Sequence, residues 1–307
     1  MSKSDKRNKR QPSAHARNVV ADCFDAQVLG EMCETWDFRD HADLVTLKPA
    51  GDGRERFYWH RDNGSDILAV AHLDTVQDDR RCSVVDTASG LLACSGALDD
   101  RLGVYVILDM LPKLEIVCDV LLTTDEEIGQ STASAFDTDK QYNWIIQFDR
   151  GGTDVVMYDY ETPQLCEMVE SSGARVGEGS YSDICMLEHL GCAGLNWGVG
   201  YNDYHSTRSH AWLDDTFRMV ARFVKFYNAN HETFIPHEPM VYDAAWAKTY
   251  RYDDSDTFTW SDDVDYTVTA GCGHVVDLAD ETSYVEVVAT SIICRNCAIN
   301  DGLADDE

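Results

Sequence analysis

Residues 115–129, EIVCDVLLTTDEEIG, decide the fold of this chain. The run from Ile116 to Thr123 is nearly continuous in apolar residues and has the length of a strand, which is typical of a strand buried on both faces. A short apolar helix is predicted just before it, over Gly103 to Leu111, and Pro112 closes that helix. The strand is followed by the acidic pair Glu126 and Glu127. A buried strand that follows a helix predicts a sheet covered by helices.

Strands and helices alternate on both sides of this stretch. Further strands are expected at 56–60, 67–71, 144–148, 155–158 and 194–199, and further helices at 18–34, 163–169, 181–190 and 212–228. Asp62, Asn63 and Gly64 favour a tight turn, so strands 56–60 and 67–71 are predicted to form a hairpin. A second turn at 87–90 lies between the short strands 84–85 and 91–94. The pattern predicts a three-layer α/β/α sandwich with a mixed, mostly parallel central sheet.

Composition changes at two positions along the chain. Residues 1–17 are polar and basic, and we expect them to be a disordered, solvated tail. Residues 18–229 hold the alternating elements and are predicted to form the main domain. From residue 230 to 307 the chain is acidic and rich in Asp, Tyr and Thr, with strand-like runs at 267–269 and 283–290. A small, β-rich C-terminal segment is therefore expected after the sandwich.

The charge balance and the cysteines limit the classes of partner. With 55 acidic and 25 basic residues the net charge is −30, and such a surface repels nucleic acid. Either a high-salt host or attraction of cationic ligands would account for the acidic excess. The 11 cysteines are odd in number and scattered, which favours a reducing compartment over a disulfide framework. No stretch approaches the roughly 18 apolar residues of a membrane span, so we expect a cytoplasmic protein without a membrane partner.

Candidate metal ligands lie where the predicted strands end. Four candidates follow strands, and one opens the helix before Pro112: His72, Glu127, Asp149, His205 and, on the helix, Asp99. Open α/β sheets expose side chains in a crevice at the carboxyl ends of their strands. The sequence therefore predicts that these five side chains meet at one edge of the sheet.

This set of side chains has the chemistry of a two-metal site. Two divalent cations about 3.5–4 Å apart need a shared carboxylate together with further carboxylates and imidazoles. We assign Asp99 as the shared ligand, with His72 and Asp149 completing one site and Glu127 and His205 completing the other.

Two more acidic residues are given roles beside the ligands. Asp74, two residues beyond His72, would accept the other imidazole N–H and so fix the orientation of the ring. Glu126 would act as the general base, taking a proton from the water that attacks a carbonyl and passing it to the leaving amine. Individually, a His-x-Asp or a Glu-Glu pair is most often a solvated loop or a helix cap, so the argument depends on the order of all five positions.

Six strings carry a family resemblance: AHLDTV, GALDDRLGVYVIL, TTDEEIG, QFDRGG, GSYSDI and GVGYNDYHS. Together they resemble the two-zinc exopeptidases, which include bacterial leucyl aminopeptidases, tetrahedral aminopeptidases and the aminoacylase and carboxypeptidase group. The resemblance covers residues 66–228. It implies a zinc exopeptidase-like fold, two Zn²⁺ per chain with Co²⁺ or Mn²⁺ as alternatives, and the same five ligands and base. It also implies a cis peptide bond between Asp99 and Asp100.

The chain departs from these families in three places. The interval from Asp74 to Asp100 is too short for the oligomerisation domain of the tetrahedral aminopeptidases. The interval from Asp149 to His205 is too short for the lid domain of the carboxypeptidase group. Ser209 stands where many relatives have a glutamate, four residues beyond the last histidine. The sequence thus predicts a minimal core, while recognition of the substrate's end and the oligomeric state stay open.

Two further sites have alternatives. Asp183 is a substrate-binding residue of the site loop by resemblance, or else a helix cap. In the C-terminal segment, Cys272, His274, Cys294 and Cys297 would hold a structural Zn²⁺ in the manner of a zinc ribbon, and the alternative is free thiols in a small β segment.

The resulting hypothesis is a metal-dependent hydrolase that cleaves a terminal amide bond of a peptide or small amide. We favour an aminopeptidase, because a long acyl-amino-acid or carboxypeptidase pocket is harder to build without a lid domain. An acidic surface also attracts a free ammonium. A deacylase or carboxypeptidase-like amidohydrolase is the alternative within enzymes. Outside enzymes, the alternative is a non-catalytic, metal-binding interaction module.

Overall fold

The chain divides into two compact units, Met1–Met240 and Val241–Glu307, and the first carries all the helices described below. The computed structural model describes residues 19–34, 44–47, 53 and 55–238, and the backbone of four short strands in the second unit. The predicted basic tail, residues 1–17, lies outside the described residues. The first unit runs beyond the predicted boundary after residue 229, because residues 230–238 still contact it: Ala193 N–H donates to Ile235 O at 2.9 Å.

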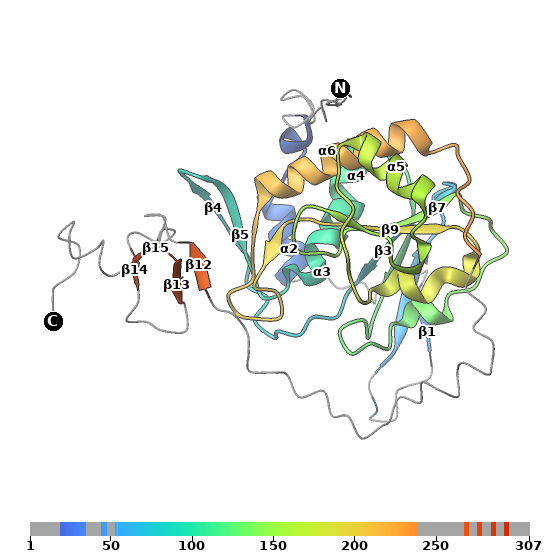
Figure 1. Cartoon of the computed structure of the whole chain (residues 1–307). Coiled ribbons are helices and arrows are strands. Elements are labelled where there is room, and N and C mark those ends of the chain that lie inside the picture. The colour runs from blue at the N-terminus through green and yellow to red at the C-terminus, as the bar shows by residue number, and fades with distance from the viewer. Residues whose placement is uncertain are drawn as a thin grey trace, which may run out of the picture. The chain divides into compact units, whose positions relative to one another are not determined.

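A seven-stranded mixed sheet forms the centre of the first unit (Figure 1). Its strands, in spatial order, are β1 (Leu44–Thr46), β2 (Phe57–Arg61), β6 (Asp119–Thr123), β3 (Ile67–His72), β7 (Trp144–Gln147), β9 (Ala193–Trp197) and β8 (Val155–Val156). The strands β6, β3, β7 and β9 are parallel, and the outer strands β2, β1 and β8 pair antiparallel with their neighbours. The predicted mixed, mostly parallel sheet is confirmed.

The predicted hairpin between the second and third strands is wrong. Strand β6 lies between β2 and β3, antiparallel to the first and parallel to the second. The turn residues instead hold the start of β6: Asn63 N–H donates to Asp119 Oδ1 at 2.9 Å, and Asn63 Nδ2 donates to Cys118 O at 2.7 Å. Because β3 and β6 are buried along their whole length, pairing them with each other covers more apolar surface than a local hairpin would.

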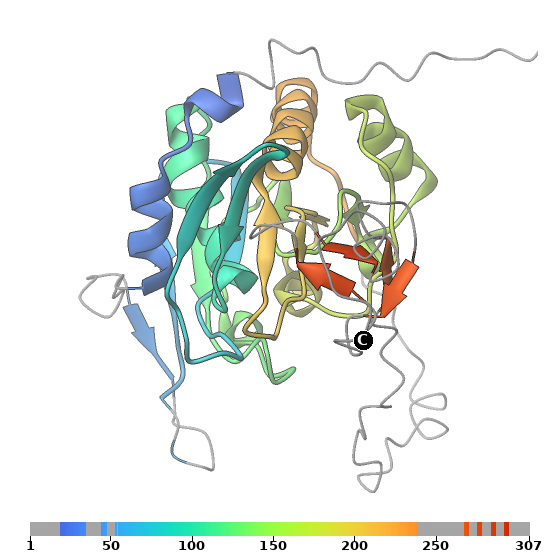
Figure 2. The same cartoon turned by 90° about the vertical axis from the view of Figure 1, so that its left-hand side faces the viewer.

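Helices and short helical turns cover both faces of the sheet (Figures 1 and 2). They are α2 (Ala26–Glu34), α3 (Leu98–Tyr105), η2 (Val106–Met110), α4 (Leu111–Lys113), η3 (Thr132–Ala135), η4 (Tyr158–Tyr160), α5 (Pro163–Ser172), η5 (Asp183–Leu190) and α6 (Leu213–Asn230). Trp144 and Gln147 of β7 point to opposite faces, since strand side chains alternate. Trp144 packs on Phe226 of α6, whereas Gln147 bonds to Asp183 of η5. The three-layer sandwich is therefore confirmed.

Three predicted helices differ in detail. The first is broken at residues 23–25, because the Asp25 carboxylate accepts from Gln27 N–H at 2.9 Å and so begins α2. The helix expected at 103–111 starts earlier, at Leu98, contains the π turn η2, and has Pro112 in its last turn. The helix expected at 181–190 is the 3-10 segment η5, Asp183–Leu190.

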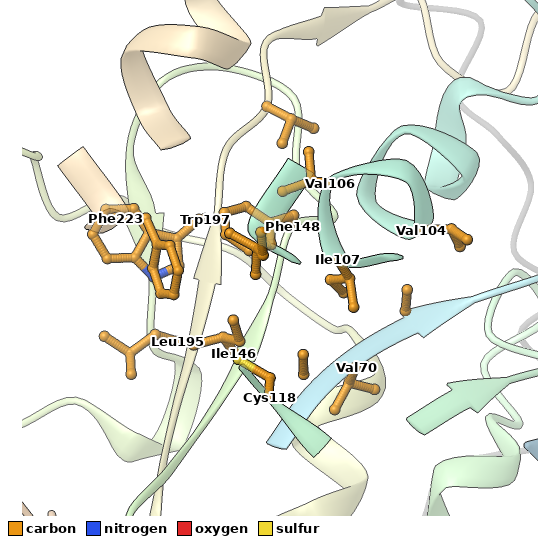
Figure 3. Close-up of a cluster of buried hydrophobic side chains, with 14 of the residues drawn as sticks. Val70, Val104, Val106, Ile107, Cys118, Ile146, Phe148, Leu195, Trp197 and Phe223 are labelled. Carbon is orange, nitrogen blue, oxygen red and sulfur yellow. The ribbon is translucent and has the colours of Figure 1, made fainter. Parts of the chain in front are cut away.

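The core lies between the sheet and the helices α3, η2 and α6 (Figure 3). Phe223 of α6 packs edge-on against Phe148 at 5.1 Å and Trp197 at 5.5 Å between ring centroids. Beside them, Ile107 of η2 is buried in the same cluster as Val70 of β3. Burial of these large aromatic side chains against α6 helps to fix the strands whose ends carry the candidate site.

A second sheet of four strands flanks the first. Its spatial order is β10 (Tyr201–Asn202), β11 (His210–Trp212), β5 (Gly90–Cys94) and β4 (Ser83–Thr87). Strands β4 and β5 form the predicted hairpin, drawn in teal toward the viewer in Figure 2. The short strands β10 and β11 were not predicted. Their connection carries His205, so this sheet positions one of the candidate ligands.

The second unit contains two antiparallel pairs, β12 (Thr267–Thr269) with β13 (Val275–Asp277) and β14 (Tyr284–Glu286) with β15 (Ile292–Cys294). Strand β12 has the bounds of the expected run 267–269, and β14 lies within the expected run 283–290. The side chains of Cys272, His274, Cys294 and Cys297 lie outside the described residues, so the structural zinc site stays a prediction. Within the described part of the chain, no helix is both long and apolar enough to cross a membrane.

Candidate metal centre

The carboxylate of Asp99 lies between two imidazoles at the carboxyl edge of the central sheet. Its Oδ1 is 3.3 Å from Nε2 of His72, the last residue of β3. Its Oδ2 is 3.1 Å from Nε2 of His205, in the loop between β10 and β11. Each oxygen of one carboxylate thus faces a different histidine, which is the arrangement expected of a carboxylate shared by two cations.

Each histidine has a second acidic neighbour. Asp149, just after β7, places its Oδ1 3.7 Å from Nε2 of His72. Glu127, in the loop after β6, places its Oε2 2.8 Å from Nε2 of His205. The structure therefore brings the five predicted ligands together, and groups them in the pairs expected around Asp99.

The donor atoms fit a divalent cation. Nε2 of His72 and Oε1 of Glu127 are buried and have no hydrogen-bond partner. Buried polar groups rarely stay unpaired, since the cost of an unpaired group is about 1–3 kcal/mol. Ligand atoms of His72, Asp99 and Glu127 all lie within 4.8 Å of one another, and so do those of His72, Asp100 and Asp149. Imidazole nitrogens and carboxylate oxygens without a thiolate suit zinc and related divalent metals.

Local sequence explains how Asp99 is presented. The peptide bond between Asp99 and Asp100 is cis, as the resemblance implied. The Asp100 carboxylate is buried and accepts from the N–H groups of His72 at 3.3 Å and Gly103 at 3.2 Å, so it ties the start of α3 to the end of β3. A Cβ on Gly103 would lie 2.2 Å from Oδ1 of Asp100 and 2.8 Å from the carbonyl oxygen of Phe148. This position therefore requires glycine.

Asp74 connects the His72 loop to the Glu126–Glu127 loop. Its backbone carbonyl lies 3.0 Å from Nδ1 of His72, and its Oδ1 lies 3.6 Å from the same nitrogen. The shorter contact to the ring is thus made by the carbonyl and not by the carboxylate. The carboxylate accepts from the backbone N–H of Glu126 at 3.4 Å and of Glu127 at 3.2 Å. Asp74 therefore orients both loops that carry candidate site residues.

Glu126 lies beside the candidate ligands and faces the cavity. Its Oε2 is 3.7 Å from Nε2 of His72, and its side chain is 12% exposed. Burial raises the pKa of Glu126 to about 9, and nearby carboxylates, including Asp149, add to the effect. A carboxyl group with a raised pKa close to cation ligands is suited to accept and release a proton.

Three residues that support Asp149 were not predicted. The Tyr201 hydroxyl donates to Oδ1 of Asp149 at 2.5 Å and lies 3.3 Å from Oδ1 of Asp99. Gln147 Nε2 donates to Oδ2 of Asp149 at 3.0 Å. Asn196 accepts from the N–H of Asp149 and donates to its carbonyl oxygen. Gln147 and Asn196 are directly paired in β7 and β9, so only the sheet register could have identified them.

Asp183 lies beneath the site and does not line the cavity. Its side chain is fully buried and accepts from Thr123 Oγ1 at 2.9 Å, from Gln147 Nε2 at 3.0 Å and from Ser131. Burial raises the pKa of Asp183 to about 6. The residue at the cap position of η5 is Ser182. In this structure Asp183 bonds to Gln147, which also holds Asp149, and Asp183 neither stands at the cap position of η5 nor lines the cavity.

The loop that carries His205 is held from the other side of the site. Gln77 Nε2 donates to the backbone carbonyl of His205 at 2.7 Å. His205 and Asp203 both have positive φ angles, 63° and 50°, which are uncommon for residues other than glycine. The Gln77 bond contributes to keeping the imidazole turned toward Asp99.

The charges in the site are strongly coupled. Burial alone would lower the pKa of His72, but nearby carboxylates, Asp149 first, raise it well above its ordinary value. Hydrogen bonds with Asp99 and Glu127 raise the pKa of His205 to about 10. Burial would raise the pKa of Asp99, yet the two imidazoles hold it well below its ordinary value. The carboxylates of the site therefore favour a positively charged group beside each carboxylate oxygen of Asp99.

These groups open into a cavity of about 490 Å³, a size that suits a small ligand. Its acidic and imidazole lining consists of Asp99, Glu126, Glu127, Asp149 and His205, and its aromatic lining consists of Tyr158, Tyr181, Tyr201 and Tyr204. Four of the five candidate ligands and the candidate base thus line the same cavity, and His72 is buried behind it.

No protein-family model and no curated protein sequence matches this chain. Among solved structures, it is similar to aminopeptidase PepT from Bacillus cereus, at 12% identity and a TM-score of 0.43 over 72% of this chain and 99% of that one. It is similar to the LapA aminopeptidase of Legionella pneumophila, at 14% identity and a TM-score of 0.44 over 75% of this chain and 77% of that one. It is also similar to a Zn-dependent exopeptidase from Parabacteroides distasonis, at 15% identity and a TM-score of 0.41 over 72% and 98% of the two chains. Aminopeptidases and a zinc-dependent exopeptidase are thus among the structures that this chain resembles, as the sequence motifs predicted.

Proposed function

We propose that this protein is a metal-dependent hydrolase that cleaves a terminal amide bond of a peptide or small amide. The observation that carries the proposal is the position of Asp99, with one carboxylate oxygen at 3.3 Å from His72 and the other at 3.1 Å from His205. Asp149 and Glu127 would complete the two sites, and Zn²⁺ is the proposed metal at both, with Co²⁺ or Mn²⁺ as alternatives. When bound, two such cations polarise the scissile carbonyl and lower the pKa of water.

The chain's own residues would supply the remaining chemistry. Glu126 would take the proton of the attacking water on its carboxylate and later deliver it to the leaving nitrogen, as a general base and then a general acid. Only 12% of the Glu126 side chain is exposed. This enclosed position would keep the transferred proton within the site. Asp74 would hold Glu126 in place through its N–H, and Tyr201 with Gln147 would hold Asp149.

An aminopeptidase is the activity that we favour, and a deacylase or carboxypeptidase-like amidohydrolase is the alternative. The acidic surface attracts a free substrate ammonium, which supports the first. A non-catalytic interaction module would need neither a shared carboxylate between two histidines nor a buried carboxyl group of raised pKa at the cavity wall. Those two features therefore favour an enzyme.

The test combines metal analysis with a substrate panel. Purified protein should hold about two ions per chain in the first unit, measured by elemental analysis. Glu126→Gln should abolish turnover of aminoacyl reporter amides while keeping the metal content, and the same change at Glu167, exposed on α5, is the control. Wild-type protein that turns over no free-amine, N-acylated or free-carboxylate substrate, although it holds two metals, would contradict the proposal.

A further inference from the structure

Arg150 is the one Lys or Arg side chain among the described residues that line the cavity. It directly follows the candidate ligand Asp149 in the sequence, and its side chain is 25% exposed. The other charged groups of the lining are carboxylates and His205. Arg150 is therefore a positively charged residue of the cavity lining that is not one of the proposed metal ligands.

The guanidinium of Arg150 is held in a fixed orientation. Its Nε lies 2.7 Å from Oδ1 of Asp154 and its Nη2 lies 3.3 Å from Oδ2. The Nε–Nη2 edge of the guanidinium is thus bound to the Asp154 carboxylate. Nη1 has no partner within the described structure. A guanidinium can bind carboxylates along more than one edge, so the free donors of Arg150 are available to a ligand.

Two glycines make room for this ion pair. A Cβ on Gly177 would lie 2.1 Å from Oδ2 of Asp154, which excludes any other residue there without a shift of the pair. A Cβ on Gly179 would lie 3.2 Å from Nη1 of Arg150 and 3.2 Å from the ring of Tyr158. Gly179 also lines the cavity, so the absence of a side chain there leaves room for a ligand beside Nη1.

We propose that Arg150 binds a free carboxylate of the substrate, so that the cavity takes short peptides that carry such a group near the scissile bond. This inference rests on the proposed hydrolase function and specifies its substrate class. Arg150 is the one Lys or Arg side chain among the described residues of the lining, so it is the side chain that can hold a substrate carboxylate through charge-assisted hydrogen bonds. Because Asp149 and Arg150 both line the cavity, a small ligand bound there can contact both.

The carboxylate has two sources, the C-terminus of a short peptide or an acidic side chain. The test uses zinc-loaded Glu126→Gln protein, in which ligands are not consumed, and calorimetry with three ligands. These are an apolar dipeptide, its C-terminal amide, and a dipeptide amide with a glutamate as its second residue. We expect at least one of the two carboxylates to bind ten or more times tighter than the neutral amide. Adding Arg150→Gln should reduce that ratio to below three.

Arg218→Gln is the matched control. Arg218 is also paired with an aspartate, Asp215, at 2.5 Å, and is 32% exposed, but it lies on α6 away from the cavity lining. The control should keep the full preference for a carboxylate. The ratio compares ligands on one protein, so it does not depend on the fraction of folded variant. Equal binding of all three ligands to the parent protein, or a preference that survives Arg150→Gln, would overturn the proposal.

Turnover separates this inference from the function on which it rests. If the wild type hydrolyses amides but treats acids and neutral amides alike, the hydrolase proposal holds and the role of Arg150 is wrong. If it hydrolyses nothing while an Arg150-dependent preference for carboxylates is measured, the carboxylate site holds and the hydrolase proposal fails.

Discussion

Replacing Glu126 by glutamine should stabilise the metal-free protein at neutral and alkaline pH while abolishing hydrolysis. The Glu126 side chain is 12% exposed and lies among the carboxylates of the site. Burial raises its pKa from 4.5 to about 9, with further contributions from Asp149, Asp183 and Asp99. An ionised carboxylate at this position is therefore costly in the folded chain without cations, and a neutral amide of the same shape avoids that cost.

The pKa difference gives the sign and the size of the effect. A folded-state pKa above the unfolded value means that the folded protein binds the proton more tightly. This contribution to stability is complete below pH 4.5 and is lost as the pH rises through about 9. At about 1.4 kcal/mol per pKa unit, the loss by pH 8 is on the order of 5 kcal/mol. Glutamine does not titrate, so Glu126→Gln should exceed the wild type by a few kcal/mol at pH 8 and match it near pH 4.5.

Chemical denaturation of chelator-treated protein at half-unit steps from pH 4.5 to 9 measures this difference directly. Glu167→Gln, on the exposed side of α5, makes the same chemical change and should show no such pH dependence. Adding zinc should reduce the advantage of Glu126→Gln, because cations compensate the carboxylate in the wild type. A stability difference between wild type and Glu126→Gln that stays constant across this pH range would refute the reasoning.

Other substitutions test the ligands, their support and the core. Asp99→Ala removes the carboxylate between the two imidazoles and should lower the bound metal from about two ions to at most one by elemental analysis; two retained ions would contradict its shared role. Tyr201→Phe removes the hydrogen bond to Asp149 and should weaken metal binding about 10–100-fold in a competition assay with a chelating dye, whereas an unchanged affinity would exclude a positioning role. Trp197→Ala, at a fully buried ring that packs on Phe223, should destabilise the protein by about 3–5 kcal/mol in urea unfolding, and a loss below 1 kcal/mol would show that the core rearranges.

The convergence of the candidate ligands could be predicted because it follows from strand direction. His72 ends β3, Glu127 and Asp149 follow β6 and β7, and these three strands are parallel neighbours. Once apolar runs identify the strands, their carboxyl ends must share an edge of the sheet. The sequence alone also indicated Asp99, because it precedes a clear apolar helix.

Long-range pairing explains what could not be predicted. The Asp62–Gly64 turn has the composition of a hairpin loop, yet β6 takes the place between β2 and β3 because pairing two buried strands covers more apolar surface. The hydroxyl of Tyr201 reaches Asp149 only because β10 brings Tyr201 beside Gly151, a contact between segments about 50 residues apart. Nothing in the composition around Tyr201 or Gln77 marks such partners in advance.

The dense acidic cluster links the stability of this fold to its proposed chemistry. The site holds four largely buried carboxyl groups, those of Asp99, Glu126, Glu127 and Asp149. Each ionised carboxylate therefore raises the free energy needed to ionise its neighbours. Protons on the two histidines can supply at most two compensating charges, and hydrogen bonds with Asp99 and Glu127 raise the pKa of His205 to about 10. Two divalent cations supply four. Relief of the electrostatic repulsion that makes the bare site costly would therefore add to the affinity that the ligands give for metal ions.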